Sequence, residues 1–220
     1  MRFFNLYQFL APAILVPLSY WLWWRRYDQQ HEFVLLALSM PVLFAYVIPG
    51  IGTNLLGLWE FNTRFRLGKF RPHHGFVFGS ATSMLTLVCL DRAPAEMTVW
   101  EVARAGIVLG SVLGFWNWFY DIQAIKSGFI IVYNRPYADR LGAEAIAMDY
   151  APFLFGAFGL CYGAALRIAE WMLLVRGDSA LYWWLFIACN LVVLTVPVAI
   201  LIGCSYVRNG TSGLKPLKRD

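Results

Sequence analysis

Long apolar stretches separated by short polar segments follow one another along the whole chain. A helix of about 20 apolar residues crosses a hydrocarbon core of about 30 Å, because each residue adds about 1.5 Å of rise. The pattern therefore predicts an all-α integral membrane protein built as a bundle of about six transmembrane helices. We place these helices at residues 7–24, 33–58, 75–90, 99–121, 150–174 and 180–206.

The segments outside these helices do not suggest a second domain. Residues 128–133 are apolar but too short to cross a bilayer, so we predict a re-entrant or interfacial segment there. We expect one transmembrane domain over residues 1–207 and a short basic tail over residues 208–220.

Two of the predicted helices carry glycines at helical spacing. Gly106, Gly110 and Gly114 recur every four residues in the fourth helix, and Gly159 and Gly163 do so in the fifth. Such small faces let two helix backbones approach closely. We expect these helices to pack on each other, or the first three glycines to contact a partner subunit or a second copy of the chain.

The composition supports the membrane assignment. Hydrophobic residues make up 60% of the 220 residues and charged residues only 14%, whereas about a quarter of a soluble domain is charged. With the N-terminus inside, twelve Lys and Arg residues fall on cytoplasmic segments, and those outside are Arg25, Arg26, Arg92 and Arg176. The positive-inside rule then predicts cytoplasmic termini and a multi-pass location in the cell (inner) membrane. Since the net charge of +5 lies in short loops, we expect a lipid bilayer as partner and no nucleic acid.

Polar side chains gather at the predicted cytoplasmic ends of the helices. Asn117 and Asp121 are four residues apart, so they share one helical face. At the same level lie Glu60 and Asn62 at the end of the second helix, and Asp149 and Tyr150 at the start of the fifth. This grouping predicts a cytoplasm-facing pocket with apolar and aromatic walls. The same residues are also ordinary helix caps and interface anchors.

Carboxyl groups close to hydrocarbon are candidates for acid-base chemistry, because they resist ionisation and can donate a proton. Charged groups within membrane helices are costly, which makes them functional candidates. The candidate acids or bases are Glu60, Asp121 and Asp149. Candidates for substrate binding are Asn62, Arg64, Arg71, Asn117, Arg135 and Tyr150, the arginines being suited to a phosphate.

Metal and cofactor signals are weak. His73 and His74 are adjacent, and on a helix adjacent side chains point about 100° apart, so a metal would need further ligands from Glu60, Asp121 or Asp149. Beside several basic residues, the two histidines equally suit a phosphate head group. The four cysteines all lie in apolar runs without a Cys-x-x-Cys pair, and no cofactor is indicated.

Two charged pairs have helical spacing. Arg167 and Glu170 are three residues apart in the fifth helix, and Glu101 and Arg104 have the same spacing at the outer end of the fourth. Residues three apart are neighbours on a helix surface, so we expect structural salt bridges in both places.

Two short stretches resemble parts of known families. Asn117, Tyr120 and Asp121, followed by Asn134-Arg135-Pro136, resemble a fragment of the intramembrane aromatic prenyltransferase signature, although Ile125 stands where that signature has a second Asp. Trp59-Glu60 is similar to a Trp-Glu feature of small membrane-bound terpene cyclases, in which carboxylates protonate an epoxide or olefin. Neither stretch assigns the chain to a family, and no activity is carried over.

Three functional hypotheses remain. The first is a membrane enzyme that acts on an isoprenoid or lipid-like substrate by carboxylate acid-base chemistry. The second is a non-catalytic structural or assembly subunit of a larger complex that binds pigment, quinone or lipid. The glycine faces and the abundant aromatic residues support this hypothesis. The third is a small transporter, although no internal repeat is visible.

Overall fold

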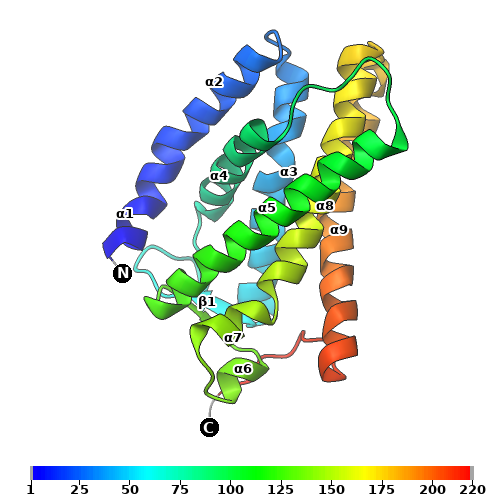
Figure 1. The fold of residues 1–220 in the computed structure, drawn as a ribbon. Helices are drawn as coiled ribbons and strands as arrows, with labels where there is room; N and C mark the ends of the chain where they lie inside the picture. The colour runs from blue at the N-terminus through cyan, green and yellow to red at the C-terminus, as the bar shows by residue number, and fades with distance from the viewer. Residues whose placement is uncertain (1, 219–220) are drawn as a thin grey trace.

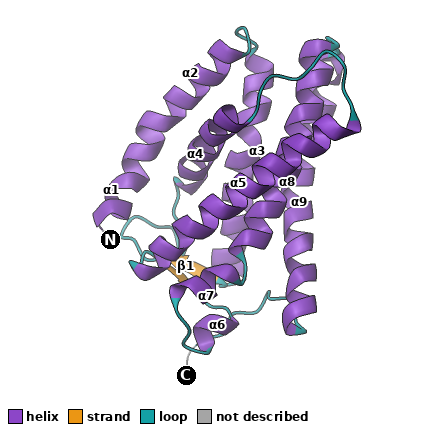
Figure 2. Ribbon diagram, viewed as in Figure 1, coloured by secondary structure: helices purple, strands orange, loops and turns teal. Residues whose placement is uncertain are grey.

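The computed structural model describes residues 2–218 as a bundle of helices with a small sheet at one end (Figures 1 and 2). The helical elements are α1 (Arg2–Leu10), η1 (Ala11–Leu15), α2 (Val16–Arg26), α3 (His31–Gly50), η2 (Ile51–Leu55), α4 (His74–Cys89), α5 (Val99–Lys126), α6 (Arg135–Ala138), α7 (Ala143–Met148), α8 (Ala151–Glu170), η3 (Trp171–Val175), η4 (Ser179–Leu181) and α9 (Tyr182–Asn209). The strands are β1 (Trp59–Phe61) and β2 (Ile130–Val132).

Among the described residues, five helical segments are long and apolar enough to cross a membrane. They are Arg2–Arg26, His31–Leu55, Val99–Lys126, Ala143–Val175 and Ser179–Asn209. The helix α4 is apolar but has only 16 residues, which corresponds to about 24 Å of rise. The prediction of an all-α protein with several helices that are long and apolar enough to span a membrane is confirmed. The expected span over 75–90 corresponds to this shorter helix.

The second predicted helix is too long at its C-terminal end. Its helical structure ends at Leu55 instead of continuing to residue 58, and Trp59–Phe61 form the strand β1. Glu60 therefore lies on a strand, and Asn62 follows that strand instead of closing a helix. The last turn, Ile51–Leu55, is π-helical.

The two short strands explain the apolar segment at 128–133. Strand β1 pairs with β2 in antiparallel register, with Glu60 opposite Ile131. Segments of three residues leave backbone N–H and C=O groups that need partners, and pairing across the sheet supplies them. The segment that we predicted to be re-entrant or interfacial therefore forms a strand, and its pairing partner lies about 70 residues earlier in the chain.

The glycine faces of α5 and α8 pack directly on each other. A Cβ atom built on Gly106 would lie 2.8 Å from the carbonyl oxygen of Leu160, and one on Gly163 would clash with the carbonyl oxygen of Ala105. Gly110 faces Gly156 at this same contact. The expected packing of these two helices is confirmed. The glycine face of α5 is thus covered by α8 of the same chain.

A buried ion pair holds the end opposite the sheet. Arg167 and Glu170 lie 2.9 Å apart with side chains that are 1% and 5% exposed. The other Glu170 oxygen accepts a hydrogen bond from the amide of Ala93 at 2.6 Å, and Arg167 donates to the carbonyl of Asp91 at 2.8 Å. The expected salt bridge therefore also fixes the loop between α4 and α5. Glu101 and Arg104 lie 3.7 Å apart near the surface.

The start of α1, the sheet, α6, α7 and the end of α9 lie at one end of the bundle (Figure 1). The C-terminal end of α5 and the N-terminal end of α8 reach the same level. The helix ends on which we expected the polar residues therefore lie at one end of the bundle.

Candidate functional site

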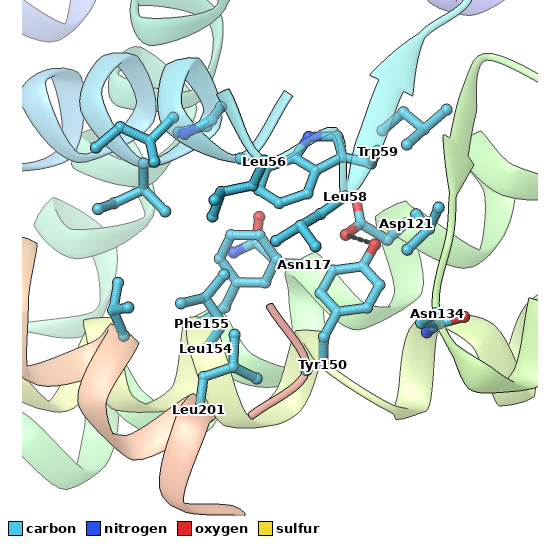
Figure 3. A pocket seen from close by; sticks show the side chains of 18 of the residues that line it. Leu56, Leu58, Trp59, Asn117, Asp121, Asn134, Tyr150, Leu154, Phe155 and Leu201 are labelled. Carbon is cyan, nitrogen blue, oxygen red and sulfur yellow. Dashed lines mark hydrogen bonds between the residues drawn. The ribbon is translucent and has the colours of Figure 1, made fainter. Parts of the chain in front are cut away.

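A cavity of about 240 Å³ lies at the sheet end of the bundle (Figure 3). Its walls come from the end of α3, from both strands, from α5, α8 and α9, and from residues 212–214 of the tail. Most of its lining is apolar or aromatic, and Trp59, Phe155 and Leu201 are among the side chains that face it. Five of the predicted site residues also line it, namely His74, Asn117, Asp121, Asp149 and Tyr150.

Asp121 and Tyr150 form a hydrogen-bonded pair in the wall of this cavity. The Tyr150 hydroxyl donates to Oδ2 of Asp121 at 2.6 Å, and the two groups point toward each other beside Trp59 and Leu58 (Figure 3). Asp121 is 7% exposed and has no ion pair with any described residue. The long helix α5 brings the carboxyl from one side, and the residue that precedes α8 brings the phenol from the other.

Two amides lie near this pair. The Asn117 side chain donates to the carbonyl of Leu113 at 2.8 Å, one turn earlier in α5. The Asn134 side chain donates to the carbonyl of Ile146 and accepts from the amide of Tyr137, so that it caps α6 and ties α6 to α7. Asn117 therefore presents a polar group to the cavity from a helix, whereas Asn134 is held by the loop that it caps.

Asp149 is engaged in holding the end of α9. Its Oδ1 accepts hydrogen bonds from Arg208 at 3.2 Å and from Asn209 at 3.3 Å. Arg208 also contacts the backbone carbonyl of Asp149 and lies over the ring of Phe153 at 4.3 Å. An aspartate with three polar contacts to α9 fits a tether between α8 and α9. The structure thus gives it a partner that the sequence spacing did not indicate.

The chain after α9 returns across the cavity. Ser212, Gly213 and Leu214 contribute to the lining, and the amide of Leu217 donates to the carbonyl of Tyr133 at 2.7 Å. Lys218 lies 5.7 Å from the centre of the Tyr133 ring. Together with the Arg208 contacts, these interactions hold the described part of the tail against the cavity, where it forms part of the wall.

Glu60 is not among the residues that line the cavity, although it contacts one of them. Its Oε1 accepts a hydrogen bond from the Tyr133 hydroxyl at 2.6 Å, and Arg66 lies 3.7 Å from its other oxygen. Burial, followed by this hydrogen bond to the carboxylate, raises the pKa of Tyr133 above its usual value of 10.0. The structure therefore separates Glu60 from Asp121 and Asp149. Tyr133, which does line the cavity, was not among the residues expected from the sequence.

The remaining predicted substrate-binding residues are dispersed. Arg64 and Arg135 are exposed, and Arg135 lies 3.7 Å from Asp139. The Asn62 side chain is exposed and donates to the carbonyl of Gly128 at 3.1 Å. Arg71 is the exception, because it is only 1% exposed. Of the three arginines, only Arg71 is therefore buried.

The two histidines have different environments. The His74 Nδ1 atom lies 2.6 Å from the Arg71 guanidinium, whereas the His73 ring stacks between Phe9 and Phe65. Burial, together with the nearby Arg71 charge, lowers the pKa of His73 to about 4. Residues 2–218 contain no group of three His, Cys, Asp or Glu side chains placed to hold a metal ion.

In comparisons with known proteins, no family, curated protein or solved structure matches this chain.

Proposed function

We propose that the protein is an integral membrane enzyme that binds an isoprenoid or lipid-like substrate in the cavity and acts on it by acid-base chemistry at Asp121. The observation that carries the proposal is the Asp121–Tyr150 pair, a buried carboxyl and phenol in an otherwise apolar and aromatic wall. Small-molecule sites are mostly apolar with a few placed polar groups, as this cavity is.

The size of the cavity is consistent with part of such a substrate. Its volume of about 240 Å³ is slightly below the range of about 300–1,000 Å³ that is typical of ligand pockets. The reacting end of a longer apolar molecule would fit inside, while its remainder would lie along the neighbouring helices. The aromatic wall, which includes Trp59 and Phe155, suits an electron-poor intermediate, because aromatic faces attract positive charge.

The proposed roles follow from the contacts of each side chain. Asp121 transfers a proton to or from the substrate, and Tyr150 orients its carboxyl through the hydrogen bond of 2.6 Å. Asn117 offers a polar contact to a substrate group from the same helical face. Glu60 and Asp149 serve the structure, since one binds Tyr133 and the other binds the end of α9.

The topology that we propose has six spans, with α4 as the shortest, and both termini in the cytoplasm of a cell whose inner membrane holds the protein. It is supported by the excess of Lys and Arg on the segments at the sheet end, where the start of α1 and the end of α9 also lie. The cavity would then face the cytoplasm.

The alternative of a non-catalytic subunit rested on the glycine faces and the abundant aromatic residues, and the glycine faces are now accounted for by the contact between α5 and α8. A transporter would be favoured by a site near the middle of the bundle, whereas this cavity is lined by both strands of the sheet at one end of the bundle.

Native mass spectrometry of protein extracted gently from its own membrane tests the binding step, and we expect an apolar molecule to be retained. Incubation with isoprenoid alcohols and with the retained molecule, followed by product analysis, tests the chemistry. Asp121→Asn should abolish product formation while the variant still binds, and Glu60→Gln is the matched acid-to-amide control that should keep it. Normal turnover by Asp121→Asn would overturn the assignment.

A further inference from the structure

A buried arginine without an anionic partner stands beside a second, smaller cavity. Arg71 is 1% exposed and has no ion pair with any carboxylate among the described residues. Its Nη2 contacts His74, but its Nε and Nη1 atoms are buried and donate to nothing that the structure describes. A buried guanidinium normally pairs with a carboxylate or a phosphate, because leaving such a charge unpaired is costly.

The guanidinium is held firmly on one side. Its central carbon lies 5.0 Å from the ring centre of Phe61 and 5.3 Å from that of Phe129. Contacts between a cation and aromatic faces fix the group in place without neutralising its charge. The arginine is therefore positioned, yet its charge is still available to an anion.

A second unused donor lines the same cavity. The Tyr120 hydroxyl is buried beside the Arg71 guanidinium, which can only donate to it, and its own proton is donated to no group of the described residues. The cavity, of about 50 Å³, is lined by Arg71, Tyr120 and Tyr7 at one end. One water needs about 10–15 Å³ of such space, so the cavity has room for a group of several atoms, such as a phosphate or a carboxylate.

Away from Arg71 the lining is mostly apolar and follows α4, with Thr82 and Asn117 as its polar members. Val77, Ala81 and Leu85 lie at successive turns of this helix, and Trp116 of α5 faces them. The lining therefore leads away from Arg71 between α1 and α5, along the first three turns of α4. A polar end with two free donors and an apolar continuation match the two parts of an amphiphile.

We propose that this second cavity binds the anionic head group, a phosphate or a carboxylate, of a lipid-like molecule whose chain lies along α4. Arg71 and Tyr120 hold the anion, and Arg64, Arg66 and Lys69 on the preceding loop attract negatively charged lipid to this end of the protein. The site is separate from the Asp121 cavity, although Asn117, Tyr120 and His74 lie between the two. Its existence does not depend on the proposed acid-base chemistry.

Thermal unfolding in neutral detergent tests the site, since a ligand that binds only the folded protein raises the unfolding midpoint. Dodecyl phosphate and dodecanoate supply the amphiphile, inorganic phosphate supplies the anion alone, and dodecyl maltoside supplies the chain alone. We expect the two anionic amphiphiles to raise the midpoint by at least about 2 °C. An equal rise with inorganic phosphate would overturn the lipid assignment, and no rise with any anion would overturn the site.

Substitutions at single residues then test whether the amphiphile binds at Arg71 and Tyr120. Arg71→Gln should weaken the binding of dodecyl phosphate by about tenfold or more, because a charge-assisted contact is lost. Arg25→Gln removes the same charge from an exposed position in the last turn of α2, outside the lining of both cavities, and should leave the affinity unchanged. Tyr120→Phe removes one donor only and should weaken binding less, which keeps the test decisive if Arg71→Gln does not fold. Unchanged affinity in Tyr120→Phe together with unchanged or unmeasurable binding in Arg71→Gln would contradict the proposal.

Discussion

The Tyr150 hydroxyl lies 2.6 Å from Oδ2 of Asp121, so that the residue before α8 is hydrogen-bonded to the C-terminal part of α5. The two side chains come from helices whose glycine faces pack together farther along the bundle. The close helix contact thus brings a carboxyl and a phenol together at the edge of the larger cavity. The same hydrogen bond therefore connects the two packed helices and positions the Asp121 carboxyl in the cavity wall.

Removing the phenol should therefore destabilise the protein. In Tyr150→Phe the buried Asp121 carboxyl loses its donor, and we expect the free energy of unfolding to fall by about 1–3 kcal/mol. Tyr206→Phe is the control, because Tyr206 is 55% exposed on α9, and it should change stability by less than about 0.5 kcal/mol. In a double-mutant cycle with Asp121→Asn, the two losses should not add. Strict additivity would mean that the two groups are not coupled.

The buried ion pair should be far more sensitive than the surface pair with the same spacing. Glu170→Gln leaves the Arg167 charge buried without its carboxylate, and we expect a loss of about 3–5 kcal/mol. Glu101→Gln breaks the pair with Arg104 near the surface, which should cost at most about 1 kcal/mol. Unfolding in detergent compares the two directly. Equal losses would show that the charge on Glu170 does not support the loop between α4 and α5.

The contact between α5 and α8 can be tested with a single methyl group. Gly163→Ala would force a Cβ against the Ala105 carbonyl oxygen, and overpacking of this kind costs about 1–3 kcal/mol. Gly203→Ala in α9 meets no atom within 4 Å, so the higher helix propensity of Ala should leave stability unchanged or raise it by up to about 1 kcal/mol. The unfolding midpoints of both variants check this order. A harmless Gly163→Ala would mean that the helices are farther apart.

His73 should make the protein sensitive to mild acid. Its pKa is about 4 in the folded protein, below the usual 6.5, so the unfolded chain binds a proton first as the pH falls. The contribution of this histidine to stability is therefore lost progressively between about pH 6.5 and pH 4. His73→Phe keeps an aromatic ring between Phe9 and Phe65 and should flatten this decline. Identical stability profiles of the two proteins over this range would exclude the effect.

The sequence-based predictions that the structure confirms were those that rested on helix length and on helical spacing. The apolar runs predicted membrane helices, and glycines four residues apart predicted the packing of α5 on α8. Arg167 and Glu170, three residues apart, form the expected pair. In a helix, neighbours at three and four residues are set by the backbone itself. Such features can be read from a sequence because their partners are close along the chain.

The candidate site depends on contacts between distant segments. Strand β1 pairs with β2 about 70 residues later, and this pairing turned the expected helix end at Glu60 into a strand that faces Tyr133. The burial of Arg71 beneath Phe61 and Phe129 and the tethering of Asp149 by Arg208 are of the same kind.

The sequence by itself determined which segments are apolar enough for a membrane and which side chains share a helical face, because both follow from composition and from the 3.6-residue period. Only the tertiary structure decided that Asp121 meets Tyr150, that Glu60 binds Tyr133 instead, and that Arg71 is buried without an anionic partner among residues 2–218. The physical reason is that helix packing and strand pairing bring together residues far apart in the chain. No local spacing encodes those distances.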